Sequence, residues 1–280
     1  MKRFFTYIAI IILASCLVSA KTTPRKKREK LVLIETQYGN IKVKLYNETQ
    51  LHKENFLNLV KNHFYDSLIF HRVIEDFMIQ GGDPDIVKTQ NNQQLKNVDY
   101  TTLIPAEIRA DKFHKRGALC AARMGDNVNP EKKSSPTQFY LVQGRVFSQK
   151  DLELIESQRN FSVKQKLLAD FFKTEDGKIA EQQLQDLYNQ RKLSAMNDFC
   201  DSIANKLVVD NPNIELFSFS PEQKKAYTTI GGSPHLDGDY TVFGEVVDGL
   251  NVIDSIAAVE TNNRNRPFTD IIMKMRIVKK

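Results

Sequence analysis

The chain has 280 residues, of which 41% are hydrophobic, and its formal net charge at pH 7 is +6. This length is enough for one sizeable core, or for one domain that carries a substantial insertion. The charge is modest for this size, and the basic run at residues 22–30 contains no aromatic residues, so we do not expect a nucleic-acid-binding protein.

The first 20 residues are typical of an export signal. Lys2 and Arg3 precede the apolar run FFTYIAIIILA, which is too short to span a bilayer. Two cleavage sites compete: VSA at residues 18–20 fits ordinary signal removal, whereas LASC at residues 13–16 resembles a bacterial lipobox. The presence of Cys16, which would be lipidated, favours the lipobox. Either site predicts an exported protein, in the periplasm or anchored at a membrane of the cell envelope.

Residues 21–30 contain the run TTPRKKREK, which we interpret as a basic, solvated tether. The alternative is a patch that contacts anionic lipid head groups. Two cysteines follow the signal, Cys120 and Cys200. An oxidising compartment would allow a disulfide between them, but buried free thiols are the simpler interpretation.

Residues 31–147 are rich in strand patterns. The segments LVLIETQ and NIKVKLY flank Tyr38-Gly39-Asn40, and the second alternates apolar and polar side chains, which predicts a β-hairpin. Residues 51–64 follow with apolar side chains at helical spacing. Further short apolar runs lie at residues 117–124 and 137–144.

Residues 148–229 have a different character, because they are rich in Glu, Gln, Lys and Leu and almost free of Gly and Pro. Ser148 with Asp151 three residues later is typical of a helix N-cap, and SPEQ at residues 220–223 is a capping box with proline at the first helical position. We therefore predict a helical insertion. Its apolar stripes are most simply core, although a groove for partners is an alternative.

Strand patterns return in residues 230–280. The segment YTVFGEVV predicts a strand, GLNVIDSIAAV a short helix, and DIIMKMRIV a final strand. Short strands on both sides of a helical block favour a closed antiparallel β-barrel with an insertion.

Common catalytic motifs are missing from the sequence, which contains no Walker loop, GxGxxG, CxxC, HExxH or GxSxG motif. The five histidines do not have the spacing of metal ligands. We therefore expect neither a metal, a cofactor nor a covalent intermediate.

The segment FHRVIEDFMIQGGD, residues 70–83, places Arg72 and Gln80 among large apolar side chains. Burying such polar groups without partners costs several kcal/mol, about 2–7 depending on the reference state. In isolation Arg72 would be interpreted as an ion-pair partner of Glu75 or Asp76, and the apolar neighbours as core. The combination instead suggests a surface that is both apolar and polar, as a binding site requires.

This segment resembles the signature of the cyclophilins, the cyclosporin-type peptidyl-prolyl cis-trans isomerases. The resemblance continues in ENFLNLVKNHFYDSLIFHRV, GALCAARM, SPTQFYLVQG and HLDGDYTVFGEVVDGLNVID, which follow one another in the order of the family and cover more than half of the chain. The helical block interrupts the match between residues 143–144 and 231–232. The resemblance implies a mainly β fold, a closed eight-stranded antiparallel barrel capped by two helices, with the active groove on its outer surface.

The resemblance also implies roles for individual residues. Arg72 matches the catalytic arginine, with Gln80 beside it, and Gln138 matches a glutamine that positions the substrate. The remaining matches form the walls and rim of a proline pocket: Phe77, Met78, Ala122, Arg123, Phe139 or Tyr140, His235, Leu236 and Tyr240. The backbone at Ala122 and Arg123 stands where a bound peptide would pair.

Four positions depart from the family pattern. Tyr140 stands where phenylalanine is usual, and Arg123 replaces the usual asparagine. His235 and Tyr240 stand where vertebrate members carry tryptophan and histidine. These changes leave the proline pocket largely intact, but they put in doubt the fit of cyclosporin and the preference for residues next to proline.

The chemistry follows from the peptide bond itself. An Xaa-Pro bond rotates over a barrier of about 20 kcal/mol because amide resonance must be lost. Twisting makes the prolyl nitrogen pyramidal and gives it a lone pair, to which an arginine can donate a hydrogen bond that exists only in the twisted state. No cofactor is required for this reaction.

We therefore expect an exported, monomeric prolyl isomerase that acts on proline-containing polypeptides and assists their folding. An alternative is a peptide-binding or chaperone module in which the helical insertion does the main work and catalysis is vestigial. A third, weaker hypothesis is a structural lipoprotein whose barrel only scaffolds an assembly.

Overall fold

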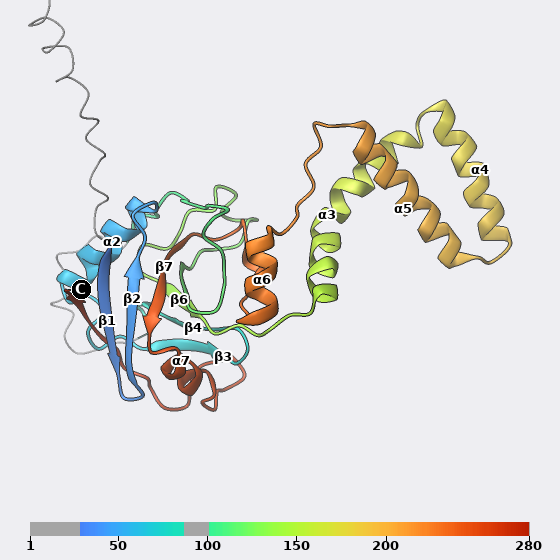
Figure 1. Ribbon diagram of the computed structural model, residues 1–280. Coiled ribbons are helices and arrows are strands. Elements are labelled where there is room, and N and C mark those ends of the chain that lie inside the picture. Colours follow the sequence, from blue (N-terminus) through green and yellow to red (C-terminus); the bar gives the residue numbers. More distant parts are fainter. Residues whose placement is uncertain (1–28, 87–100, 280) are drawn as a thin grey trace, which may run out of the picture.

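The computed structural model describes residues 29–86 and 101–279 (Figure 1). The predicted signal, Cys16 and most of the basic tether lie outside these residues. Among the described residues, no helix is long and apolar enough to span a membrane. Both described cysteines are free thiols, Cys120 buried and Cys200 half-buried.

Eight strands form one antiparallel sheet in the order β3-β4-β6-β5-β7-β2-β1-β8. Alternation of apolar and polar side chains explains strands such as β2, in which Ile41, Val43 and Leu45 are buried while the lysines between them are partly exposed. The strands are β1 (Lys30–Thr36), β2 (Gly39–Leu45), β3 (Phe70–Ile74), β4 (Met78–Gly81), β5 (Ala118–Ala121), β6 (Phe139–Val142), β7 (Val242–Asp248) and β8 (Lys274–Val278).

The sheet is curled, so that its two edge strands approach each other. An isolated bridge joins Ile69, just before β3, to Ile272, just before β8. Backbone hydrogen bonds flank it, from Phe70 N to Ile271 O at 3.0 Å and from Met273 N to Leu68 O at 2.8 Å. The mainly β fold with eight strands agrees with the prediction, whereas a continuous β3–β8 ladder is not present among the described strands.

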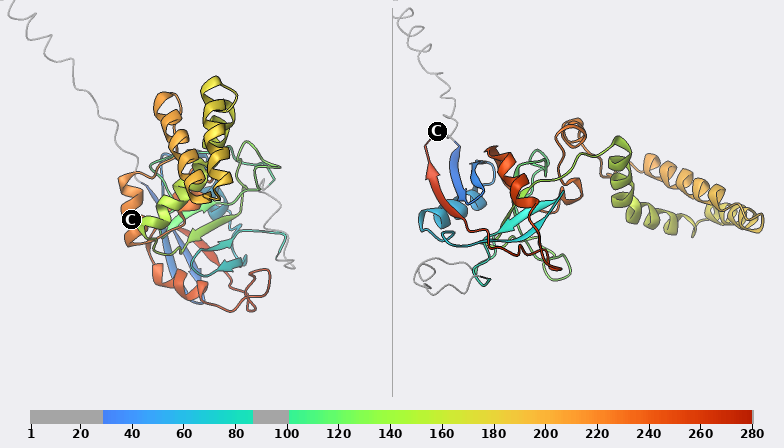
Figure 2. Two further views of the ribbon diagram at one scale, coloured as in Figure 1. Left: turned by 90° about the vertical axis from the view of Figure 1, so that its right-hand side faces the viewer. Right: turned by 90° about the horizontal axis from the view of Figure 1, so that it is seen from below.

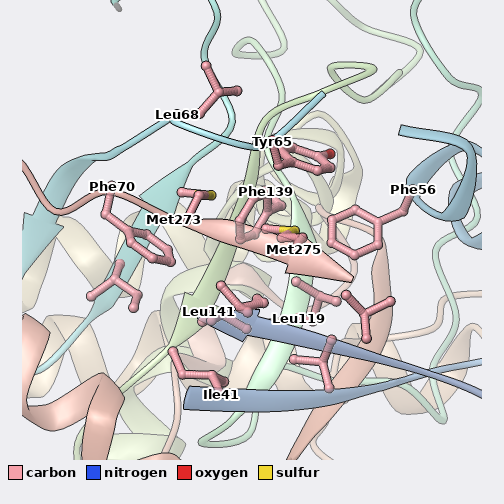
Figure 3. Close-up of a cluster of buried hydrophobic side chains, with 14 of the residues drawn as sticks. Ile41, Phe56, Tyr65, Leu68, Phe70, Leu119, Phe139, Leu141, Met273 and Met275 are labelled. Atoms are coloured by element: carbon pink, nitrogen blue, oxygen red, sulfur yellow. The ribbon is translucent and has the colours of Figure 1, made fainter. Parts of the chain in front are cut away.

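The interior of the curled sheet holds the main core, part of which Figure 3 shows. Phe56, Tyr65 and Phe139 lie at its centre, with ring centroids 5.2 to 5.6 Å apart. Two helices cover the sheet: α2 (Gln50–Lys61) packs against β7 and β8, and α7 (Leu250–Ala257) packs against β2, β3 and β4. A second apolar cluster lies on the outer face of the sheet and includes Met78 and Tyr140.

Four helices lie between β6 and β7: α3 (Gln149–Phe171), α4 (Glu175–Asn189), α5 (Leu193–Asp210) and α6 (Pro221–Thr229). Both N-terminal signals seen in the sequence form capping boxes, Ser148 with Asp151 and Ser220 with Gln223. Helices α3, α4 and α5 project away from the sheet, and we call residues 149–210 the helical arm (Figures 1 and 2). Helix α6 instead lies beside the sheet.

The chain leaves the sheet for these helices and returns to it at one point. Arg145 N donates to Gly232 O at 3.3 Å, and Gly232 N donates to Arg145 O at 3.0 Å. Gly144 has a φ of +64°, and a Cβ at this position would overlap with the backbone of Gly232. Glycine is therefore required for the two segments to approach so closely.

Candidate active-site pocket

A pocket of about 110 Å³ opens on the outer face of the sheet. It lies over the second apolar cluster, where β4, β5 and β6 meet the loop that contains the 3₁₀ turn η2 (Pro234–Leu236). All the residues that line it are among those singled out in the sequence: Arg72, Phe77, Met78, Gln80, Ala122, Arg123, Tyr140, Leu236 and Tyr240.

Strand register brings the pocket residues together. Arg72 on β3 pairs with Gln80 on β4, and Gln80 pairs in turn with Tyr140 on β6. Because side chains alternate between the faces of a strand, Met78 and Gln80 point to the same face while Ile79 between them enters the main core. The three strands therefore present a row of functional side chains to the outside.

The Arg72 guanidinium is held by neutral groups. Its Nη1 donates to Gln80 Oε1 at 3.2 Å and contacts the sulfur of Met78 at 3.8 Å, and the group lies 5.9 Å from the centroid of the Phe77 ring. Among the described residues it forms no ion pair with Glu75 or Asp76, which were the partners expected of a purely structural arginine. Its charge is thus available to a ligand in the pocket.

A chain of amides sets the orientation of Gln80. Gln80 Nε2 donates to Gln138 Oε1 at 3.0 Å, and Gln138 Nε2 donates to Asp83 Oδ2 at 3.0 Å. A carboxylate only accepts hydrogen bonds, so Asp83 requires the NH₂ group of Gln138 to face it. The two amides then align in one direction, and the oxygen of Gln80 faces Arg72.

Gln138 lies behind Gln80 and does not line the pocket, so it acts on Arg72 only through this chain. Asp83 received no role from the sequence, although it ends the segment FHRVIEDFMIQGGD. Its position three residues after Gln80 was the only available signal.

The structure decides between Phe139 and Tyr140. Tyr140 lines the pocket, whereas Phe139 points to the opposite face of β6, is 1% exposed and packs against Phe56 and Tyr65 in the main core. Phe139 is therefore a core residue, and its assignment to the pocket is corrected. Burial raises the pKa of Tyr140 well above its usual value, so its hydroxyl remains protonated.

His235 also lies outside the pocket lining. Its ring packs against the outer side of Phe77, with centroids 5.4 Å apart, and so supports one wall instead of touching a ligand. His71, next to Arg72, has a pKa lowered by burial and by the charges of Arg72 and Arg266, against the opposing effect of Asp83. A neutral His71 adds no charge beside the guanidinium.

Arg123 lies at the rim of the pocket, where its side chain is held in place by several partners. Its side chain is 4% exposed and stacks over the Tyr240 ring at 4.5 Å. Its Nε donates to Asp239 O at 2.6 Å, and its Nη1 donates to Asp126 Oδ1 at 2.6 Å. These partners hold the guanidinium at the rim beside Tyr240.

The backbone of Ala122 is already paired. Ala122 N donates to Gln138 O at 3.0 Å, and Ser135 N donates to Ala122 O at 2.8 Å. The Ala122 N–H is thus not free to donate to a bound peptide, whereas its carbonyl oxygen keeps a second lone pair that can accept from one. Ala122 and Arg123 both line the pocket, so the pairing of a peptide with this segment stays a prediction.

Within residues 29–86 and 101–279, no cluster of three or more His, Cys, Asp or Glu side chains has the arrangement of a metal site. The chemistry available in the pocket includes the cationic donor Arg72, the amide of Gln80, which Gln138 orients, and apolar walls.

The family model described as cyclophilin type peptidyl-prolyl cis-trans isomerase/CLD matches residues 31–152 and 221–277. A Staphylococcus aureus (strain USA300) protein described as "Putative peptidyl-prolyl cis-trans isomerase" is 27% identical over 244 residues, which are 87% of this chain and 88% of the relative. A Streptococcus pyogenes serotype M6 protein described as "Putative bifunctional phosphatase/peptidyl-prolyl cis-trans isomerase" is 27% identical over 246 residues, and the chain spans 37% of its length.

Among solved structures, a cyclophilin type peptidyl-prolyl cis-trans isomerase of Cryptosporidium parvum is similar in fold. The TM-score is 0.51 at 18% sequence identity, and the match covers 90% of this chain and 99% of the other.

Proposed function

Because the chain belongs to the cyclophilin-type peptidyl-prolyl cis-trans isomerase family, we propose that the pocket at Arg72 is the site at which it rotates Xaa-Pro bonds. The observation that carries this proposal is the Arg72 guanidinium, fixed by Gln80 at the edge of an apolar pocket and with no carboxylate partner among the described residues. A donor in this setting is suited to a reaction in which a nitrogen lone pair appears only in the transition state.

The pocket walls would hold the proline ring. Phe77, Met78, Tyr140 and Leu236 offer an apolar surface on which the ring replaces water. The planar amide is more polar than the twisted one, so an environment poor in water favours rotation. The amide chain from Asp83 keeps Arg72 in place, so that little reorganisation is needed during the reaction.

The scaffold supports this rigidity. We propose that the sheet is completed as a closed barrel through the contacts of residues 68–70 with residues 271–273. Such closure would tie β3, which carries Arg72, to both neighbouring segments. The division of the chain into a barrel at residues 31–147 and 230–280 and a helical insertion at residues 148–229 is part of the same proposal.

The proposed substrates are proline-containing segments of exported or envelope polypeptides, bound by a monomer. The support is the export-signal pattern of residues 1–20, in which the segment ending at Cys16 resembles a lipobox. Labelling cells with a palmitate analogue should mark the protein and should fail in Cys16→Ser; a wild-type protein that never labels would remove the lipid anchor from the proposal.

The catalytic role of Arg72 is tested with a prolyl-isomer exchange assay on a short peptide. We expect kcat/KM of Arg72→Ala to fall about 100-fold or more, because a donor aimed at the transition state is lost. Arg72→Lys keeps the positive charge but loses the fixed fork of donors. Its kcat/KM should therefore lie between the values of the wild type and Arg72→Ala.

Arg276→Ala is the matched control for this test, since Arg276 pairs with Glu35 on β1, away from the pocket. A wild-type level of activity in Arg72→Ala would show that the pocket is not the isomerase site.

A chaperone role for the helical arm is a second candidate. It is favoured by large apolar side chains that are more than half exposed on the arm: Leu154, Phe161, Ile179, Tyr188, Leu193 and Val209. Exposed apolar surface of this kind binds apolar segments of unfolded chains.

A further inference from the structure

A buried chain of hydrogen bonds runs from the pocket to helix α6. The Tyr140 hydroxyl lies 3.0 Å from His114 Nε2, and His114 Nδ1 lies 2.8 Å from Asp237 Oδ1. The other carboxylate oxygen, Asp237 Oδ2, accepts from the Tyr227 hydroxyl at 2.6 Å and from Gln223 Nε2 at 2.8 Å. Tyr227 and Gln223 both belong to α6.

The members of this chain are sealed from water, because none of the five is more than 7% exposed. Asp237 Oδ1 also accepts from the backbone N–H of His114 at 2.9 Å, so the carboxylate accepts four hydrogen bonds. That number fills its acceptor capacity. A carboxylate buried in this way depends on every one of its donors.

The direction of the chain follows from the carboxylate. Since Asp237 only accepts, His114 must donate from Nδ1, and in the neutral ring Nε2 is then an acceptor. The Tyr140 hydroxyl therefore donates to Nε2. The ring planes of His114 and Tyr140 are nearly parallel, at 12°.

The series of hydrogen bonds joins two walls of the pocket that are far apart in the sequence. Tyr140 forms one wall, and Leu236, the neighbour of Asp237, forms another. The Tyr240 ring, which also lines the pocket, stands at 85° to both Tyr140 and His114. A displacement of Asp237 would therefore alter the width of the pocket.

We infer that this chain makes α6 a part of the isomerase site, with Tyr227 as a positioning residue that sets the pocket walls through Asp237 and His114. The inference rests on the proposed function of the pocket. Tyr227 does not touch the pocket, and its hydroxyl acts at a distance of three hydrogen bonds from Tyr140. The hydroxyl of Tyr140, which stands where the family usually has phenylalanine, is the group that makes the connection.

The physical reason is the cost of an unsatisfied carboxylate. If Tyr227 loses its hydroxyl, Asp237 must find another donor or move towards water, and Leu236 moves with it. Catalysis by a preformed pocket is sensitive to such shifts, because displacements of about 1 Å can cost two orders of magnitude in rate. Binding of the proline ring by apolar contact tolerates them better.

The test is a double-mutant cycle on the full chain with the peptide exchange assay. Tyr227→Phe should lower kcat/KM about tenfold, mainly through kcat, with KM within about twofold of the wild type. Tyr140→Phe should have a similar effect. Either change breaks the same series of hydrogen bonds. The kcat/KM of the double variant should therefore also be about tenfold lower than that of the wild type, instead of about 100-fold lower.

Tyr38→Phe is the matched control, since Tyr38 lies in the exposed β1–β2 turn. A Tyr227→Phe variant with wild-type kcat/KM, or effects of the two substitutions that multiply, would overturn the inference. A structural role alone would lower the melting temperature without the split between kcat and KM and without this coupling.

If Tyr227→Phe does not fold, the inference is tested by finding which ring nitrogen of His114 carries the proton in the wild type. Nitrogen-15 NMR should show a proton on Nδ1 and none on Nε2, and a proton on Nε2 overturns the inference. Failure of the proposed function is distinct, because the wild type would then be inactive or Arg72→Ala would remain active.

Discussion

Glu107 holds three groups at the beginning of helix α2. Its carboxylate accepts from the backbone N–H groups of Leu51 and His52, at 3.0 and 2.9 Å, and lies 2.7 Å from His52 Nδ1. The N-cap residue, Thr49, makes no side-chain cap. A carboxylate from a distant loop therefore satisfies the free N–H groups of the helix and suits its positive end.

His52 makes stability depend on pH. Its Nε2 lies 2.9 Å from Ser134 Oγ, and burial lowers its pKa from 6.5, although Glu107 opposes this effect. The folded state therefore favours the neutral ring, and the unfolded chain takes up the proton first as the pH falls. The contribution of His52 to the free energy of unfolding should be complete above pH 6.5 and should be lost as the pH falls below it.

Urea unfolding at pH 8 and pH 5.5 measures this decline. His52→Asn should reduce the difference between the two pH values. An equal decline in wild type and His52→Asn would contradict the assignment.

For individual residues, the sequence predicted which side chains lie together only where the partners are close along the chain. Arg72, Met78 and Gln80 could be predicted together because they lie within one short segment. The His52–Ser134 and His114–Asp237 pairs could not, since their members are 82 and 123 residues apart. Only the fold decides which of five scattered histidines meets a carboxylate.

Among the elements, strands β2 and β7 are joined by a carboxylate between two lysines. Glu245 on β7 lies 2.6 Å from the Nζ of Lys44 on β2 and 2.7 Å from the Nζ of Lys115. Burial alone would raise the pKa of Glu245, but the hydrogen bonds from Lys115 and Lys44 lower it to about 2. The ionised form is thus strongly favoured in the folded protein.

Glu245→Gln should destabilise the protein at pH 7 by about 1–2 kcal/mol, less than the full pKa shift implies because solvent screens the partly exposed lysines. The stabilisation by Glu245 is complete above pH 4.5 and is lost as the pH falls towards 2. Denaturant unfolding of wild type and Glu245→Gln should therefore converge in acid.

Glu35→Gln serves as the control, because its partner Arg276 is exposed, and it should cost less than about 0.5 kcal/mol. A difference between wild type and Glu245→Gln that persists unchanged at pH 2 would count against this account.

Helices and strands differed in how well they could be predicted. The capping boxes at Ser148 and Ser220 are local signals, and both are present where the sequence indicated. In contrast, apolar residues fill both faces of β6, so alternation alone could not tell whether Phe139 or Tyr140 faces the pocket. The register with β4 decided that question.

For the whole molecule, the helical arm extends the surface well beyond the sheet (Figure 2). Its base is fixed near the pocket, where Arg159 Nη2 on α3 donates to Asp239 Oδ2 at 3.3 Å. An unfolded client with a proline in the pocket would therefore have the arm beside it.

If the arm binds clients, removing apolar side chains should weaken protection against aggregation. The combined variant Phe161→Ser, Ile179→Ser and Val209→Ser removes side chains that are 60%, 64% and 79% exposed. We expect a several-fold loss in suppression of light scattering by an unfolded client, because buried apolar area drives such binding.

The control exchanges polar residues on the same helices, Gln165→Ser, Gln182→Ser and Asn205→Ser, with the helical circular dichroism signal of both variants compared to the wild type. Equal protection by both combined variants would remove the chaperone role.

The paired backbones of Arg145 and Gly232 bear on how fast the molecule folds. Folding is slower when contacting residues are farther apart in the sequence. The helices between β6 and β7 increase this separation for every contact between the two parts of the sheet. However, α3, α4 and α6 begin at their own local caps, and α3 and α5 pack against each other. Once the helices have formed, they bring Arg145 and Gly232 together as a short connection would. Each doubling of a flexible loop costs only about 0.6 kcal/mol in closure entropy, and the preformed arm reduces even that cost.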